Sequence, residues 1–270
     1  MKHLSKVLLA TGALALSTFA HAGPVFNWDV TTTGIWSSFA PDPGVTRSGD
    51  LKTLSWGTGT AQGNFQQSSL VITNPVPASP NIPTWWGGGT PSAGYIAPSV
   101  KLTHHNNPIT GTSLTDATLQ VSMTLTPTNP AGGSDKDLGT IDYLIRFVET
   151  PNQAGTCDAP SPANNPCNDI FVQVAGLLNQ SFTYDGYTYF VNAFPTSGGT
   201  LSVLPPAACV AAGQLAGCIG FTTSEGDSTE LSFGVTISSE RLQVPEPGSL
   251  ALIGLALAGA GLISRRRRSA

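Results

Sequence analysis

The sequence predicts an all-β protein: an antiparallel β-sandwich or jelly roll, with a hydrophobic helix at each end of the chain. Three observations support this fold class. Apolar and polar residues alternate with a period of two, glycine and proline recur between the alternating runs, and an apolar segment lies near each terminus. Period-two alternation is the pattern of a strand with one buried face. No window between residues 23 and 243 shows helical periodicity with caps, so strands should dominate there.

The N-terminal segment, residues 1–22, has the layout of a signal peptide. Two lysines precede an apolar stretch at residues 7–16, and residues 20–22 (Ala-His-Ala) have the small-x-small pattern of a cleavage site. The apolar stretch is shorter than the ~20 residues that a membrane span needs. We therefore expect a cleavable helix, export, and a mature chain that begins at Gly23.

The body, residues 23–243, contains the alternating runs. In "LQVSMTLTP" the residues Leu119, Val121, Met123 and Leu125 share one face, and "LSFGVTISS" repeats the pattern. Further predicted strands are "KTLSWGT", "SSLVITN", "YLIRFVET", "DIFVQVA" and "GYTYFVNAF". Only "PPAACVAAGQLAGC" has the alanine content for a helical turn or two. We expect one sandwich domain, and two small sandwiches divided at "PTNPAGGSDKD" are the alternative.

The charge of the body argues against nucleic acid as a partner. Of the twelve Lys and Arg residues, two lie in the signal segment and four at the C-terminal end. The other six Lys and Arg residues and all sixteen acidic residues lie in residues 23–247, which therefore have a net charge of −10. An acidic surface repels phosphate backbones, and it is typical of a soluble exported protein.

The four cysteines form two close pairs, Cys157 with Cys167 and Cys209 with Cys218. Four cysteines allow three connectivities, which sequence alone does not distinguish. An exported chain meets an oxidising compartment, so we expect disulfides, with pairing inside each cluster. Neither spacing is C-x₂-C and no histidine lies nearby, which argues against a zinc site.

No set of residues predicts catalysis. The sequence has no G-x-S-x-G nucleophile elbow, and the possible histidine bases of the mature chain are His104 and His105. Acidic residues are present, but the sequence does not pair two of them across a cleft as a glycosidase requires. The stretch "SDKDLG" lacks the third acid and the closing Glu of a calcium loop. We therefore predict a non-enzymatic protein without a metal or cofactor.

Trp85 and Trp86 are the candidate glycan contact. They lie in "NIPTWWGGGTPSAGY", among prolines and glycines and outside any alternating strand. Exposed aromatic rings can stack on sugar rings. The alternative is that one or both cap the end of the core, because tryptophan is mostly buried. Trp28, Trp36 and Trp56 lie in strand contexts, and we predict that they are core residues.

The C-terminal segment, residues 244–270, combines three features. The residues Val244, Pro245, Glu246 and Pro247 precede the apolar run 250–263, which ends before Arg265, Arg266, Arg267 and Arg268. As a helix the run would be about 21 Å long, against a hydrocarbon core of about 30 Å. The arginines favour the cytoplasmic side, and the two prolines keep the preceding residues extended and open to a protease. We predict a short transmembrane helix that holds the body outside the inner membrane for a limited time.

The stretch "VKLTHHNN" holds both histidines of the body. As a strand it would place His104 and Asn106 on the apolar, inward face, and His105 on the other face. The two rings would then point apart, which disfavours a metal site that uses both. A buried His104 with a structural role is one interpretation, and contact with a ligand or metal is the other.

These residues carry a family resemblance. Thr103, His104 and Asn106 match the Thr-His-x-Asn signature, and the sequence resembles the THxN family of PEP-CTERM proteins. The tail that begins at Val244 resembles the PEP-CTERM sorting signal itself. The blocks "LSWGTG", "FVETPN" and "CNDIFV" are similar to those around the signature in such proteins.

The resemblance implies a destination. PEP-CTERM proteins are exported by Gram-negative bacteria that make extracellular polysaccharide, are inserted transiently in the inner membrane, and are processed near Pro-Glu-Pro by a membrane protease called exosortase. The body of the family has no assigned biochemical activity. We therefore expect a non-enzymatic matrix, biofilm or adhesion component at the cell surface or in the extracellular matrix. The alternative is a secreted module that binds extracellular polysaccharide, or, with less support, a glycan-active enzyme.

Overall fold

The computed structural model describes residues 23–87, 89–153, 155–163, 165–175, 178–198 and 200–240. The predicted signal peptide at residues 1–22 and the predicted sorting tail at residues 244–270 both lie outside the described residues. Among the residues that are described, no helix has the length and apolar character needed to cross a membrane.

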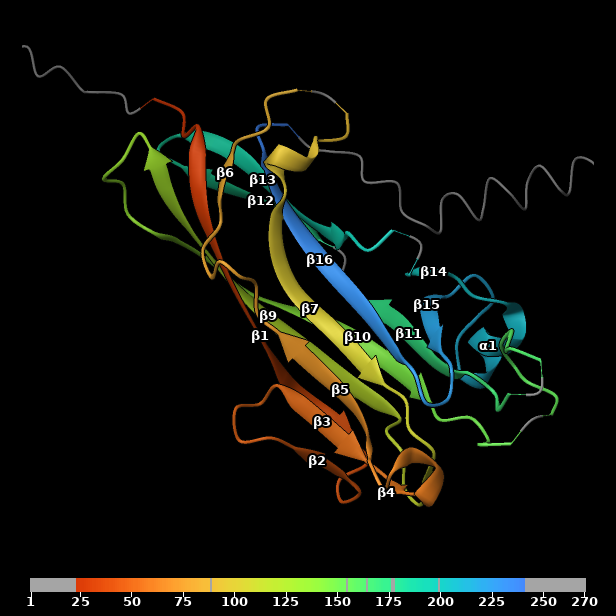
Figure 1. Ribbon diagram of the computed structural model, residues 1–270. Coiled ribbons are helices and arrows are strands. Elements are labelled where there is room, and N and C mark those ends of the chain that lie inside the picture. Colours follow the sequence, from red (N-terminus) through yellow and green to blue (C-terminus); the bar gives the residue numbers. More distant parts are fainter. Residues whose placement is uncertain are drawn as a thin grey trace, which may run out of the picture.

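In the described part of the chain, two antiparallel seven-stranded sheets pack against each other (Figure 1). The order of the first sheet is β14-β15-β11-β10-β9-β1-β6, and the order of the second is β12-β13-β16-β7-β5-β3-β2. The first sheet contains β1 (Asn27–Ala40), β6 (Asn81–Pro83), β9 (Asp116–Asn129), β10 (Lys136–Val148), β11 (Asp169–Ala175), β14 (Ser202–Val203) and β15 (Ile219–Thr223). The second contains β2 (Val45–Arg47), β3 (Thr53–Trp56), β5 (Ser68–Thr73), β7 (Ala97–His105), β12 (Leu178–Tyr184), β13 (Tyr187–Pro195) and β16 (Ser228–Ser238). This arrangement confirms the predicted all-β fold and is that of a β-sandwich.

Short elements complete the described structure. β4 (Thr58–Gly59) and β8 (Ile109–Thr110) form a two-stranded sheet of their own. Two 3₁₀ turns, η1 (Ala61–Gly63) and η2 (Ala93–Tyr95), lie in loops, and α1 (Pro206–Ala211) lies in the alanine-rich segment predicted to be helical.

The core follows the predicted alternation. In β9, Leu119, Val121, Met123 and Leu125 are all buried, and β16 buries its own apolar set in the same way. Trp28, Trp36 and Trp56 are fully buried, which confirms their prediction as core residues. Burying one face of each sheet against the other removes this apolar surface from water, the main favourable contribution to folding.

β9 and β10 pair as neighbours in the first sheet, with Val121 opposite Ile141. The segment considered as an alternative domain boundary, residues 127–138, contains the connection between these two strands. Strands from both halves of the sequence therefore share one sheet and one main core cluster.

The predicted disulfides are confirmed, and both pair locally. Cys157 bonds to Cys167, and Cys209 bonds to Cys218. The second bond ties α1 to the strand β15, beside a small satellite core in which Cys209 packs with Ile170 and Val172 of β11. The α1 region is thus attached to the edge of the first sheet by a covalent bond as well as by packing.

We expect loss of the Cys209–Cys218 bond to destabilise the protein. The bond has a sequence separation of 9, and closing a loop of this size contributes roughly 2 to 3 kcal/mol in the chain-entropy model. The double variant Cys209→Ala/Cys218→Ser should lower the free energy of unfolding by about this amount, measured by urea denaturation. Chemical reduction of this variant reports on the Cys157–Cys167 bond alone, and an unchanged urea midpoint in the double variant would contradict the prediction.

Candidate functional site

The Thr-His-x-Asn segment lies at the C-terminal end of β7, between β5 and β16. His104 and Asn106 point inward and are each 1% exposed. Thr103 is half-buried on the other face, paired with Val71 and Glu230 in the two ladders. His105 also points away from the core, and its Nδ1 lies 2.6 Å from the hydroxyl of Ser228. The two histidine rings therefore lie on opposite faces of the strand.

Aromatic rings enclose His104. Its ring stacks on Trp56, with centroids 5.9 Å apart, and meets the edge of Phe147 at 4.9 Å. Burial lowers the pKa of His104 to about 3, with a smaller contribution from His105. The imidazole is therefore neutral near pH 7. Its Nε2 lies 3.9 Å from Oδ2 of Asp169, which is too far for a hydrogen bond.

Asn106 fixes the turn between β15 and β16. Its side-chain amide donates to the carbonyl of Thr223 at 3.0 Å, and its backbone N–H donates to the carbonyl of Asp227 at 2.9 Å. In return, the backbone N–H of Gly226 donates to the carbonyl of Asn106 at 3.0 Å. Three hydrogen bonds thus hold the turn, and with it Glu225, against the end of β7.

The carboxyl group of Asp169, which lies near His104, interacts with those of Glu149 and Glu225, and we call Glu149, Asp169 and Glu225 the acidic cluster. Oδ1 of Asp169 accepts hydrogen bonds from the backbone N–H and the hydroxyl of Thr150, at 2.9 and 3.2 Å. Oε2 of Glu149 accepts the indole N–H of Trp56 at 3.1 Å. The cluster is therefore held by neutral donors from the surrounding strands and loops.

Burial dominates the electrostatics of the acidic cluster. Desolvation raises the pKa of Asp169 far above its usual range, and repulsion from Glu149 raises it further. Desolvation also raises the pKa of Glu149, and it raises the pKa of Glu225 to about 7. Among the described residues, the Lys and Arg ion pairs are Lys101–Glu230 and Arg146–Asp116, and neither includes a member of the cluster.

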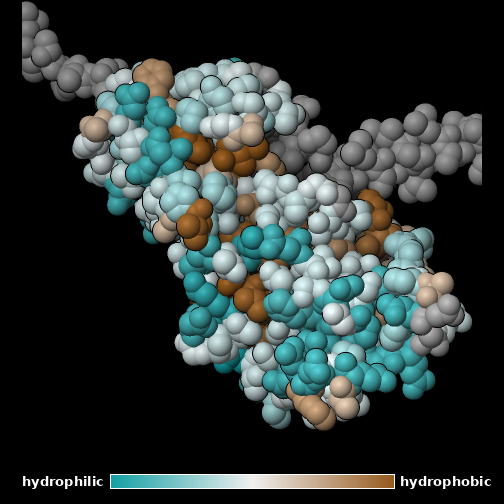
Figure 2. All heavy atoms as spheres, viewed as in Figure 1, coloured by the Kyte–Doolittle hydropathy of each residue, from teal (hydrophilic) through white to brown (hydrophobic). Residues whose placement is uncertain are grey.

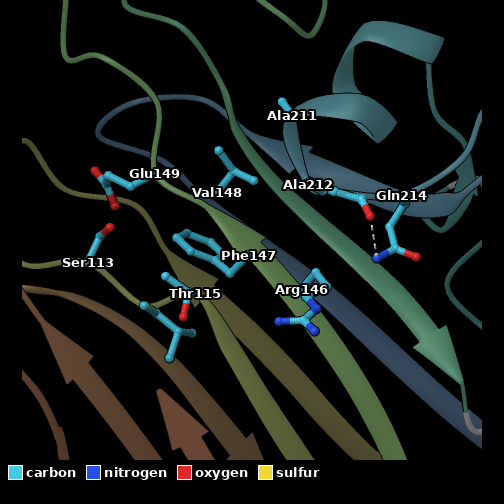
Figure 3. Close-up of a pocket in the computed structure, with 11 residues that line it drawn as sticks. Ser113, Thr115, Arg146, Phe147, Val148, Glu149, Ala211, Ala212 and Gln214 are labelled. Carbon is cyan, nitrogen blue, oxygen red and sulfur yellow. Dashed lines mark hydrogen bonds between the residues drawn. The ribbon is translucent and has the colours of Figure 1, made fainter. Parts of the chain in front are cut away.

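Glu149 also borders a cavity of about 490 Å³. Figure 3 shows Glu149 and Ser113 at one side of this cavity, and Gln214, from the turn after α1, at the other. Arg146 lines the cavity too, and its guanidinium lies 3.3 Å from the carboxylate of Asp116. The lining thus contains hydroxyl, carboxyl, guanidinium and amide groups that can bind a polar ligand.

Trp85 and Trp86 have different surroundings. Trp85 is half-buried, packs edge-to-face on Tyr95 at 4.8 Å, and donates its backbone N–H to Ile237. Trp86 is 44% exposed and lies 5.8 Å from Phe26, which is 47% exposed. The structure thus gives Trp85 a packing role at the end of β16 and leaves Trp86 with Phe26 as an exposed aromatic pair.

Sequence reasoning missed the acidic cluster. Glu149 and Asp169 lie in two of the quoted blocks, "FVETPN" and "CNDIFV", but nothing in the sequence shows that these blocks meet. Glu225 lies in a turn of ordinary composition and gave no signal at all. No group of three or more His, Cys, Asp or Glu residues in the described part of the chain is already arranged to hold a metal ion.

We expect Asn106→Ala to destabilise the protein by about 1 to 3 kcal/mol, because a buried hydrogen-bonded amide is lost and the Thr223 carbonyl loses a donor. Asn107→Ala is the matched control. Its amide bonds to Gln67 at a more exposed position, and the change should stay within about 0.5 kcal/mol. Urea denaturation of both variants tests this, and equal losses would show that the turn does not depend on Asn106.

The C-terminal segment is the part that comparison with known proteins identifies. A family model described as the PEP-CTERM protein-sorting motif matches residues 243–268. This range includes the Val-Pro-Glu-Pro sequence at residues 244–247 and the four arginines at residues 265–268, which all lie outside the described residues. It does not include Thr103, His104 or Asn106, so membership of the THxN family stays a prediction. No curated protein was found to match the chain. The chain therefore carries the PEP-CTERM sorting motif at residues 243–268.

Proposed function

We propose that the protein is a non-enzymatic matrix, biofilm or adhesion component, routed to the cell surface or the extracellular matrix. The observation that carries the proposal is the PEP-CTERM motif at residues 243–268, which implies export, membrane-associated sorting and an exosortase-type processing partner. The N-terminal signal peptide predicted at residues 1–22 supplies the export route.

The short stretch of sequence between the sandwich and the motif supports this route. β16 ends at Ser238, and the backbone N–H of Ser239 donates to the carbonyl of Trp85 at 3.0 Å, so contacts of the sandwich extend to within a few residues of the motif in the sequence. From Glu240 to Leu250, where the apolar run begins, the chain can span at most about 36 Å, at ~3.6 Å per residue. A membrane-held tail would thus keep the whole sandwich close to the membrane until cleavage.

The surface and the histidines of the body support a non-enzymatic role. On the face in Figure 2, hydrophobic residues surface in separate groups among polar ones. His104 is neutral and buried, and none of the described hydrogen bonds joins its Nε2 to a hydroxyl or thiol group. His105 contacts Ser228, but no described hydrogen bond joins the other ring nitrogen to an orienting carboxylate.

We expect replacement of Pro245, Glu246 and Pro247 by alanine to block processing, because a protease that reads the extended Pro-Glu-Pro segment loses its recognition site. The variant should stay in the membrane fraction with its tail attached and be depleted from the matrix. Mass spectrometry of the C-terminus in cell and matrix fractions measures this.

The matched control for this experiment is a conservative change elsewhere in the tail, Ile263→Leu, which keeps the apolar run and should be processed normally. Wild-type protein that retains Arg265–Arg268 in every fraction would contradict the sorting step. Normal biofilm mass after deletion of the gene would contradict the matrix role while leaving the sorting step intact.

A second candidate function, glycan binding, is favoured by one observation: the exposed pair of Phe26 and Trp86. Two neighbouring aromatic rings that face solvent can stack on the apolar faces of sugar rings. An extracellular protein from a polysaccharide-producing host would meet such a ligand.

If this candidate is correct, Trp86→Ala should weaken binding of the host polysaccharide by roughly tenfold, the size expected from about 1.4 kcal/mol of lost stacking. Phe65→Ala is the control, because Phe65 is exposed but is not part of the Phe26–Trp86 pair. Affinity electrophoresis in gels that contain the polysaccharide gives the readout. Unretarded migration of the wild-type protein, or equal effects of both changes, would exclude this role.

A further inference from the structure

We propose that the acidic cluster, Glu149, Asp169 and Glu225, binds one divalent cation that prefers oxygen ligands, Ca²⁺ or Mn²⁺. Asn106 and Thr223 supply further oxygen donors, and His104 lies at the edge of the site. This site is independent of the matrix and glycan-binding roles proposed above.

The fold brings these donors together from separate parts of the chain. Asp169 begins β11 and lies opposite Thr223 in the β11–β15 ladder. The side chain of Asn106 is bonded to the Thr223 carbonyl, and Glu225 follows two residues later in the turn that Asn106 holds. A side-chain hydrogen bond joins Glu149 to Asp169, and Glu149 also interacts electrostatically with Glu225. The donors therefore converge on one location, at the end of the sandwich where β7 terminates.

The strongest observation is a set of buried polar atoms without a hydrogen-bond partner. This set comprises Nε2 of His104, Oδ1 of Asn106, Oγ1 of Thr223 and both carboxylate oxygens of Glu225. It also includes one oxygen each of Glu149 and Asp169, whose carboxyl groups are hydrogen-bonded to each other. His104, Asn106, Asp169 and Thr223 are each only 1% exposed, and Nε2 of His104 points toward Asp169 at 3.9 Å. Buried polar groups are nearly always paired, so a concentration of free acceptors at one place indicates a binding partner.

The charge of the cluster determines what that partner is. The unpaired atoms are almost all oxygen acceptors, three of the residues are acids, and no Lys or Arg ion pair of the described residues includes them. Hard divalent cations take carboxylate, amide and hydroxyl oxygens as ligands. A single imidazole beside these oxygens is compatible with Mn²⁺ as well as Ca²⁺.

Binding requires a local movement, because the described side chains do not already form a group of three ionisable ligands. Carboxylates repel one another, so a cation would draw Glu149 and Glu225 toward Asp169. Both are long, half-buried side chains in loops, and rotation about their own bonds can supply the movement. Asp169, Thr223 and Asn106 are fixed by the strands, and they provide the rigid side of the site.

The test uses the purified full-length chain in mild detergent after treatment with a chelator. Addition of about 10 mM Ca²⁺ or Mn²⁺, above the 10⁻⁴–10⁻³ M range of weak extracellular calcium sites, should saturate the site. We expect the Tm to rise by roughly 5 °C, and titration calorimetry to give one ion per chain. Sodium chloride of matched ionic strength should produce no such rise.

Glu225→Gln should abolish the rise in Tm, whereas Asp227→Asn should preserve it. Both residues lie in the same turn, but Asp227 is exposed and is not part of the cluster, so its variant controls for nonspecific binding to an acidic surface.

In the wild type, Mn²⁺ should also broaden the NMR signal of the Trp56 indole N–H, which bonds to Glu149. It should not broaden that of Trp28, which packs against Phe182 and Tyr189. No rise in Tm with either ion, equal loss in both variants, or broadening of both indole signals would overturn the proposal.

Discussion

The structure depends on the burial of one face of each long strand against the opposite sheet. β1 and β9 each run for 14 residues and pair with each other along almost their entire length. Their alternate residues fill the space between the two sheets, and the large rings of Trp28, Trp36 and Trp56 lie fully within it. The turns, the α1 region and the polar end of the molecule are positioned by this packing, because they are attached to strands whose register it determines.

The polar end departs from the rule that governs the rest of the core. Most of the interior is apolar, but near His104 the sandwich buries Asp169 fully and Glu149 and Glu225 in part, together with several unpaired polar atoms. Burying polar groups without a partner destabilises the folded state unless another group interacts with them. Apolar residues at these positions would give a more stable protein. The rings of Trp56 and Phe147 pack against His104 and lower the local dielectric constant. This increases the free-energy penalty of leaving nearby polar groups unpaired.

The polar end of the sandwich explains the structural role of the Thr-His-x-Asn segment. His104 and Asn106 do not act as an exposed recognition motif, since both side chains lie inside the sandwich. Asn106 attaches the β15–β16 turn to β7, and His104 separates the aromatic core from Asp169. Both residues therefore organise the place where the acidic cluster forms. The sorting motif lies in a different part of the chain, so routing and the chemistry of the body are carried by separate segments.

Predictions from the sequence were accurate where a local pattern decides the structure. Alternation predicted the inward faces of β9 and β16, and it predicted that His104 and Asn106 point the same way. The short spacing of the cysteines led to the correct pairing of Cys209 with Cys218. Adjacent tryptophans were harder to predict, because the division between the half-buried Trp85 and the exposed Trp86 depends on Tyr95 and Phe26, which come from other loops.

By itself, the sequence determined the all-β fold class and the sorting motif, because both are specified by residues that are neighbours in the chain. The close spacing of the cysteines favoured the local pairing that the structure then confirmed. Only the tertiary structure decided that Glu149, Asp169 and Glu225 share one buried location. They reach it from the ends of three different strands, and the order of strands in the two sheets sets which ends meet. Strand order depends on long-range pairing, so no local pattern in the sequence contains it.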